Sequence, residues 1–160
     1  MNTKVPKYTY TEWFTKEEMH ENLKTWFSQL SFVKDEHRFL NNLIQSFAIK
    51  TLRKQEFEKI KEFKKALVET QKMLNPIIKQ VQKQMNQLEI MIDKVDELEK
   101  EKTYTKLHKK LLSNVNKYLL NYSSVKEKGF MNLSSILKKE QGRFFIGNPE
   151  YKLSKIQEEK

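Results

Sequence analysis

The 160-residue chain contains no cysteine and only three glycines and three prolines. Without cysteine it can form no disulfide, no thiolate metal site and no cysteine nucleophile. Tight turns draw on glycine and proline for their special backbone angles, so a fold with many turns is not expected. Hydrophobic residues make up 38% of the chain, which is enough for helices with one apolar stripe each but little for an α/β core.

The sequence also lacks the segments and motifs that mark membrane insertion or catalysis. No run approaches the roughly 18 apolar residues of a membrane span, and the first residues have no apolar core that would serve as a signal peptide. We therefore expect a cytoplasmic protein without a membrane span. Neither a Gly-rich phosphate loop nor a serine between glycines is present, so we expect no enzymatic activity and no cofactor.

A long heptad stripe extends from Ile60 to Leu98. Apolar residues recur every seven positions at Ile60, Leu67, Leu74, Val81, Leu88 and Val95. A second row lies three residues further on and has two polar members, Thr70 and Gln84. A 3.5-residue repeat keeps one seam of a helix against its partners and implies left-handed supercoiling. The stripe therefore predicts a coiled-coil bundle of long helices.

Periodicity and cap signals divide the chain into three helices between two terminal segments. The predicted helices cover residues 16–49, 53–99 and 103–141. Residues 15–142 then form one all-α domain, an elongated antiparallel three-helix bundle, because short turns make consecutive helices alternate in direction. An aromatic arm (1–14) precedes the bundle and a polar tail (143–160) follows it.

The ends of these helices are predicted from local signals. Thr15 has the position of an N-cap, and Glu18 three residues later completes a capping box. The charged run 97–102 is interpreted as a solvated turn, with Thr103 as the cap of the third helix and Gly142 as its end. Gly129 inside that helix costs about 1 kcal/mol relative to alanine, and it marks either a close approach of two helices or a local bend.

The dipeptide Asn75-Pro76 lies in the middle of the second predicted helix. Proline disfavours α geometry in the residue before it and removes a backbone donor. The chain therefore either ends a helix here, which gives a four-helix bundle, or continues through a kink. The heptad phase is the same on both sides of the proline, and this favours one helix kinked at Pro76.

Histidines and carboxylates provide the candidate metal chemistry. In an up-down-up bundle His20 and His108 lie near the end where the second helix stops, and Asp93 arrives at the same end, so the three are weak candidates for a zinc or iron site. A di-iron bundle, however, needs two Glu-x-x-His motifs, and only Glu17-x-x-His20 is present. Asp93 also falls outside the a and d positions. We therefore favour no metal.

Polar residues within the apolar stripes are interpreted as parts of the core. His37 lies in the stripe of the first helix, and a core histidine with a hydrogen-bond partner such as Glu36 fits this position better than a ligand. If it is buried and neutral, stability should fall below about pH 6, because charging a buried imidazole is costly. Tyr104, Tyr118 and Tyr122 recur at helical spacing and are also expected in the core.

The formal net charge is +10, from 31 basic and 21 acidic residues. Only three of the basic residues are arginines, and lysines alternate with glutamates in many places, as on a solvated helix face. The densest basic patches are Lys59, Lys61, Lys64 and Lys65, and Lys102, Lys106, Lys109 and Lys110. Recognition of phosphates and bases mostly uses the guanidinium group of arginine. Because arginines are few here, nucleic acid is not the favoured partner.

Two sets of spacings also carry a family resemblance. The first predicted helix contains the run Trp26-x3-Leu30-x-Phe32-x3-Glu36-x2-Phe39-Leu40, and the third contains His108-x2-Leu111 and Tyr122-x3-Lys126. The first run resembles a helix, and the second pair resembles the last helix, of uncharacterised helical-bundle proteins from Bacteroidetes-type bacteria. The resemblance covers residues 16 to about 140 and implies an all-helical cytoplasmic protein, without an activity or a ligand. Such proteins have a histidine where this chain has Lys83-Gln84-Met85, which counts against a metal site.

These features predict a non-enzymatic helical-bundle scaffold or protein-interaction module. A metal-binding bundle and a non-specific basic binder of nucleic acid or anionic surfaces are the alternatives. The first helix is shorter than the second, so part of the second stripe should lack a cover within one chain. We therefore expect self-association, most simply as a symmetric dimer, or a protein partner.

Overall fold

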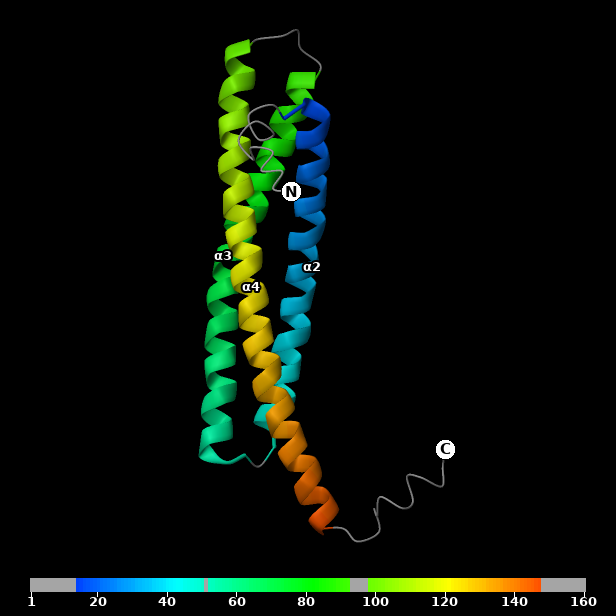
Figure 1. Cartoon of the computed structure of the whole chain (residues 1–160), viewed down its shortest axis with the longest axis vertical. Coiled ribbons are helices and arrows are strands. Elements are labelled where there is room, and N and C mark those ends of the chain that lie inside the picture. The colour runs from blue at the N-terminus through cyan, green and yellow to red at the C-terminus, as the bar shows by residue number, and fades with distance from the viewer. Residues whose placement is uncertain (1–13, 51, 93–97, 148–160) are drawn as a thin grey trace, which may run out of the picture.

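The fold is an elongated bundle of three long α-helices that lie side by side (Figure 1). In this computed structural model the described residues are 14–50, 52–92 and 98–147, with side chains described over 14–50, 52–91 and 100–140. The helices are α2 (Lys16–Ala48), α3 (Lys54–Ile92) and α4 (Leu98–Gly147). None of the three combines the length and the apolar character needed to cross a bilayer. The predicted all-α three-helix bundle is confirmed.

Side-chain contacts between α3 and α4 show that these two helices are antiparallel. Tyr104, near the start of α4, donates a hydrogen bond to the backbone of Gln84, late in α3. Tyr118, further along α4, donates to the backbone of Thr70, which comes earlier in α3. As residue numbers rise along α4, those of the contacted residues fall along α3. The helices therefore run in opposite directions, as short connections require.

Ion pairs between α2 and α4 show that these two helices are parallel. Lys16 at the start of α2 pairs with Glu101 near the start of α4, at 2.8 Å between Nζ and Oε1. Lys50, just after α2, pairs with Glu140 late in α4, also at 2.8 Å. The order is thus up, down, up, as predicted. Because α4 has 50 residues and α2 only 33, α4 projects beyond the bundle at its C-terminal end (Figure 1).

Pro76 lies inside one continuous helix, so the four-helix alternative does not hold. The heptad rows before and after the proline are buried on the same seam, with Leu74 and Val81 each no more than 1% exposed. Burial of that seam against α2 and α4 offsets the backbone hydrogen bond that a proline within a helix removes. The heptad phase therefore correctly predicted that the helix continues through Pro76.

The predicted turn between the second and third helices was misplaced. α3 ends at Ile92 rather than at residue 99, and α4 begins at Leu98, so most of the charged run 97–102 is helical and Thr103 is not a cap. Acidic residues are favourable in the first turn of a helix, and Glu-Lys pairs three or four residues apart support helix formation. A charged run is therefore compatible with a helix start as well as with a turn.

The predicted end of the last helix was also wrong, because α4 continues through Gly142 to Gly147. The helical part of the chain thus extends five residues into the segment that was assigned to the tail. A single glycine within a helix costs only about 1 kcal/mol, and the apolar run Phe144-Phe145-Ile146 contains no helix breaker. Gly142 is therefore not a sufficient stop signal.

The N-terminus of α2 has the predicted capping box. The backbone N–H of Glu18 donates to Oγ1 of Thr15 at 3.1 Å, and the backbone N–H of Thr15 donates to Oε2 of Glu18 at 3.0 Å. Two backbone donors that have no partner within the helix are thereby satisfied. This cap fixes the first residue of α2 at Lys16.

The heptad seam of α3 is covered within the single chain. Ile60, Leu67, Leu74, Val81 and Leu88 are each at most 3% exposed, and Phe63, Thr70, Ile77 and Gln84 of the second row are buried as well. The bare stretch that we expected from the unequal lengths of the first two helices is not present along the described part of this seam, because the long α4 covers it. The reason given above for self-association therefore does not hold.

Gly129 marks a close approach between α4 and α3. A Cβ atom added to Gly129 would overlap the ring of Phe63, which is 3% exposed. Phe63 also contacts the ring of Phe130 edge-on, with centroids 6.5 Å apart. Of the two interpretations of this glycine, close packing of helices is the one that the structure supports.

Replacing Gly129 by alanine should therefore destabilise the bundle. Alanine is favoured by about 1 kcal/mol in a helix interior, but overpacking a core costs about 1 to 3 kcal/mol. We expect a net loss of about 1 kcal/mol in the free energy of unfolding, measured with urea. In a Phe63→Leu background the same Gly129→Ala change should be stabilising. Equal effects of Gly129→Ala in both backgrounds would contradict the close approach.

Candidate functional site

The residues proposed for a metal site do not converge in the structure. His108 is fully buried, whereas His20 is only partly buried on α2, and the two side chains share neither a hydrogen bond nor a ring contact. Asp93 lies outside the described residues. Among the residues that are described, no three or more His, Asp or Glu side chains are placed to hold a metal ion. His20 and His108 therefore lack the grouping that zinc or iron coordination needs.

His108 lies instead in a cage of aromatic rings. Trp26 stacks on its imidazole with centroids 4.9 Å apart, Phe14 meets it edge-on at 5.2 Å, and Tyr104 lies at 6.4 Å. Nδ2 of Asn22 lies 3.4 Å from Nε2 of the ring, and Nδ1 is buried without a hydrogen-bond partner among the described residues. Burial lowers the pKa of His108 to about 4, so the ring is neutral at physiological pH.

His37 is the centre of a polar layer in the middle of the bundle. Its Nδ1 donates to the carbonyl of Val33 at 2.8 Å, and its Nε2 lies 2.9 Å from Oγ1 of Thr70 on α3. In the neutral ring Nε2 accepts the Thr70 hydroxyl proton. In the charged ring Nε2 donates, and the hydroxyl turns to the carbonyl of Leu67, 2.7 Å away. Burial lowers the pKa of His37, although the Val33 and Leu67 carbonyls and the charge of Glu36 oppose this.

Glu36 is not the partner of His37, contrary to the sequence-based expectation. Its Oε1 accepts a hydrogen bond from the Tyr122 hydroxyl at 2.5 Å and pairs with Nζ of Lys126 at 2.8 Å. Burial alone would raise the pKa of Glu36, but the bonds from Lys126 and Tyr122 outweigh it and lower the pKa. The carboxylate therefore joins α2 to α4, and the position beside His37 belongs to Thr70.

These buried groups are parts of the core rather than an open catalytic site. His37, Thr70, Tyr118 and His108 are each at most 3% exposed, so a substrate would reach them only if the bundle opened. The hydrogen bonds that they make join neighbouring helices, which is the role expected of polar groups in a core.

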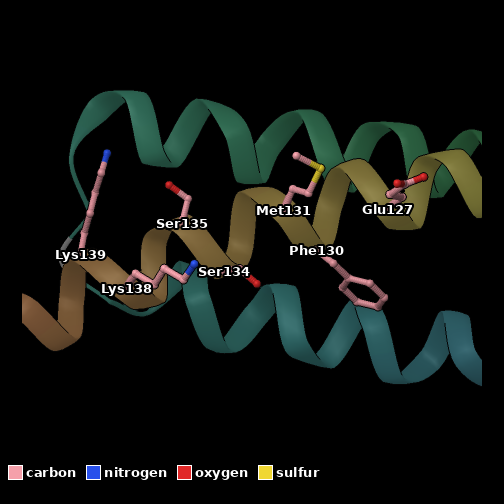
Figure 2. A pocket seen from close by; sticks show the side chains of 7 residues that line it. All are labelled: Glu127, Phe130, Met131, Ser134, Ser135, Lys138 and Lys139. Atoms are coloured by element: carbon pink, nitrogen blue, oxygen red, sulfur yellow. The ribbon is translucent and has the colours of Figure 1, made fainter.

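One surface hollow lies over the outer face of α4 (Figure 2). All of its lining residues come from this one helix, and in Figure 2 Met131 points toward α3 whereas Phe130 points toward α2. Ser134 and Ser135 have no histidine beside them in this lining, so the hollow lacks the base that activates a nucleophilic serine. It is a shallow patch on one helix.

A longer feature is the α3–α4 groove, which consists of three adjoining hollows lined only by α3 and α4. The hollow beside Pro76 shares Gln80 and Asn114 with the next one, which in turn shares Gln87 and Leu107 with the last. Between Lys72 and Met91 on α3 the groove extends over about 28 Å at the helical rise of about 1.5 Å per residue. It is the largest continuous feature among the described hollows.

The floor of the α3–α4 groove is apolar and accessible. Met73 is 55% exposed, Ile90 57% and Leu107 45%, and Pro76 and the partly exposed Met91 lie in the same floor. Isolated apolar residues on a surface need no explanation, but a row of them along one groove is less common. Heptad periodicity did not predict this groove, because it identifies the buried seam of a helix and not its other flank.

Lysines form the rim of the same groove. The lysine rim consists of Lys72 and Lys83 on α3 and Lys100, Lys110 and Lys117 on α4. No aspartate or glutamate lines the groove among the described residues. Lys110 belonged to a basic patch in the sequence, but the contribution of α3 becomes visible only when the two helices are placed side by side.

Comparisons with known proteins identify no relative of this chain. A scan against protein-family models, a search of curated proteins and a search of solved structures each find no match to the chain.

Lowering the pH should destabilise the protein through its buried histidines. The pKa of His108 falls from an ordinary value of 6.5 to about 4 on folding, so between these values the unfolded chain binds more protons. The free energy of unfolding should then fall as the pH drops, by about 1 kcal/mol per pH unit near pH 5.5, and His37 should add to the slope. Urea titrations at several pH values would measure it. His108→Phe should have a smaller slope, and an unchanged slope would argue against a neutral buried His108.

Thr70→Val should destabilise the bundle by about 1 to 3 kcal/mol, because Nε2 of His37 is then left without a partner. The valine keeps the shape of the threonine side chain, so the loss reports the hydroxyl. In a double-mutant cycle with His37→Leu, the second substitution should cost less than it does alone, since both remove the same bond. Strictly additive losses would show that His37 and Thr70 do not interact.

Proposed function

We propose that the protein is a non-enzymatic scaffold that binds another protein through the α3–α4 groove. The observation that carries this proposal is the row of exposed apolar residues in the floor of the groove, in which Met73, Ile90 and Leu107 are each about half exposed. Interfaces between proteins combine an apolar centre with a polar rim, and the groove has both. Its length of about five helical turns is enough for a partner segment of similar length.

Other exposed apolar residues support a protein interface less well. Phe32 and Phe39 on α2 are 64% and 61% exposed, but neither lines any of the described hollows. Scattered aromatic residues on a surface are ordinary. The groove is therefore the better candidate, and the two phenylalanines provide matched controls.

A second copy of the chain is the simplest alternative partner. A symmetric dimer through the groove would place the lysine rim of one copy against the same rim of the other, and juxtaposed like charges oppose association. For this reason we propose a different chain as the partner. We therefore expect a monomer in analytical ultracentrifugation at tens of micromolar, and a dimer would contradict this choice.

Photo-crosslinking in cells that produce the protein naturally would test the proposed function. With p-benzoylphenylalanine at Leu107, we expect a discrete crosslinked band that contains a second protein. The same amino acid at Phe39 provides the control, because that position is more exposed than Leu107 and would capture more in random collisions. Crosslinks of equal yield and pattern at both positions, or none at Leu107, would contradict the proposal.

A further inference from the structure

We infer that the partner segment is an acidic amphipathic helix, which lies in the α3–α4 groove with its apolar side on the floor and its carboxylates against the lysine rim. This inference rests on the proposed function, since it names the chemistry of the partner. It is carried by two properties of the groove, its one-sided charge and its shape.

The charge of the groove has one sign well beyond the rim itself. Residues 70–88 of α3 and 102–126 of α4 contain nine lysines and no aspartate or glutamate, although the whole chain has 21 acidic residues. The acidic residues lie at the two ends of these stretches and on other faces. Lys72 and Lys126 pair with Glu69 and Glu36, but the other seven lysines leave the central part of α3 and α4 with a net positive charge. A partner of opposite charge complements it.

The shape of the groove fits a helix. Two antiparallel helices that pack together leave an outer groove into which side chains of a third helix fit as ridges. Met73 lies at one end of the floor, Ile90 at the other and Leu107 between them, so an apolar stripe along one face of a partner helix would contact all three. Gln80 and Asn114, between the apolar positions, offer amide groups to polar atoms of the partner.

The terminal segments of the chain itself do not have the required charge. Residues 1–13 contain two lysines and one glutamate, and residues 148–160 contain three lysines and three glutamates. Neither segment is net acidic, so neither complements the lysine rim. A separate chain is therefore the better occupant.

Nucleic acids and anionic membranes share the negative charge but not the apolar face. Phosphate backbones would neutralise the rim and leave Met73, Ile90 and Leu107 without a cover. A bilayer surface is flat on the scale of the groove, so its headgroups would touch the rim rather than the floor. The combination of a positive rim with an apolar floor thus favours a protein helix with one apolar stripe.

A defined probe peptide tests the inference directly. The probe is an 18-residue peptide with fluorescein at one end, a leucine stripe at helical spacing, and glutamate and alanine elsewhere. Binding to the full chain is followed by fluorescence anisotropy, and we expect a Kd on the order of micromolar to tens of micromolar. A scrambled peptide of the same composition lacks the stripe and should bind at least tenfold more weakly. Equal binding of the two peptides would overturn the inference.

Matched variants locate the binding. Lys83→Glu with Lys110→Glu reverses two charges of the rim, and Leu107→Gln removes an apolar anchor; each should weaken binding of the probe about tenfold or more. Lys34→Glu with Lys61→Glu and, separately, Phe39→Gln make the same changes at exposed positions outside the groove and should change the Kd less than twofold. Groove variants that bind like these controls would overturn the inference. Circular dichroism establishes that all variants remain helical.

Two further probes separate the acidic helix from other polyanions. A fluorescein-labelled 20-base-pair DNA duplex and vesicles with phosphatidylserine are offered to the same proteins at about 0.15 M salt. Either one binding more tightly than the acidic peptide, and losing affinity when Lys83 and Lys110 are reversed, would overturn the inference in favour of a general polyanion site.

The two proposals fail in different ways. Crosslinks at Leu107 in cells, together with an acidic peptide that binds no better than its scramble, would retain the proposed function and overturn the acidic helix. Specific binding of the peptide without any crosslink at Leu107 would support the acidic helix as the chemistry of the groove and contradict the proposed function in those cells.

Discussion

Two tyrosine hydroxyls on α4 fix the register on which the bundle depends. The hydroxyl of Tyr104 donates to the carbonyl of Gln84 at 2.8 Å, and that of Tyr118 donates to the carbonyl of Thr70 at 3.0 Å. The tyrosines are two heptads apart on α4, and their acceptors are two heptads apart on α3. A shift of α4 by one residue would break both bonds inside the core, where a buried hydroxyl without a partner is costly. Apolar packing alone would not select this register so strictly.

Polar core positions have a cost as well as a use. Thr70 makes hydrogen bonds with three residues. Its backbone carbonyl accepts from the Tyr118 hydroxyl, and its own hydroxyl lies within hydrogen-bond distance of Nε2 of His37 and of the Leu67 carbonyl. Burial also raises the pKa of Tyr104 and Tyr118, so these hydroxyls keep the protons that they donate. His37 and His108, in contrast, have lowered pKa values and make the same core sensitive to acid. The buried polar groups around His37 and around His108 therefore define the alignment of the helices and also limit the pH range in which the bundle is stable.

Most of the fold could be predicted from the sequence, because burial imposes a period on the chain. The seam from Ile60 to Leu88, the continuity through Pro76 and the capping box at Thr15 all follow from local patterns and were found. The end of α3 and the start of α4 were not, since Glu and Lys are compatible with both a turn and a helix. Gly142 was misleading because one glycine is a weak stop.

The pairing of His37 with Thr70 and the α3–α4 groove were harder to predict from the sequence. A polar residue at Thr70 was visible in the heptad row, but its pairing with His37 depends on how two helices are aligned, and one sequence does not contain that alignment. The groove depends on residues from two helices that are distant in the chain. One signal was nevertheless present, namely the absence of carboxylates from residues 70–88 and 102–126.

The parallel arrangement of α2 and α4 has a consequence for the entropy of the chain. Contacts between these helices, such as that of Glu36 with Tyr122, join residues 86 positions apart, whereas Tyr104 and Gln84 are only 20 apart. Closing the longer loop in an otherwise unfolded chain costs about 1.3 kcal/mol more. Once α3 has packed against both α2 and α4, that loop is already closed. The bonds between α2 and α4 then form without this additional entropic cost.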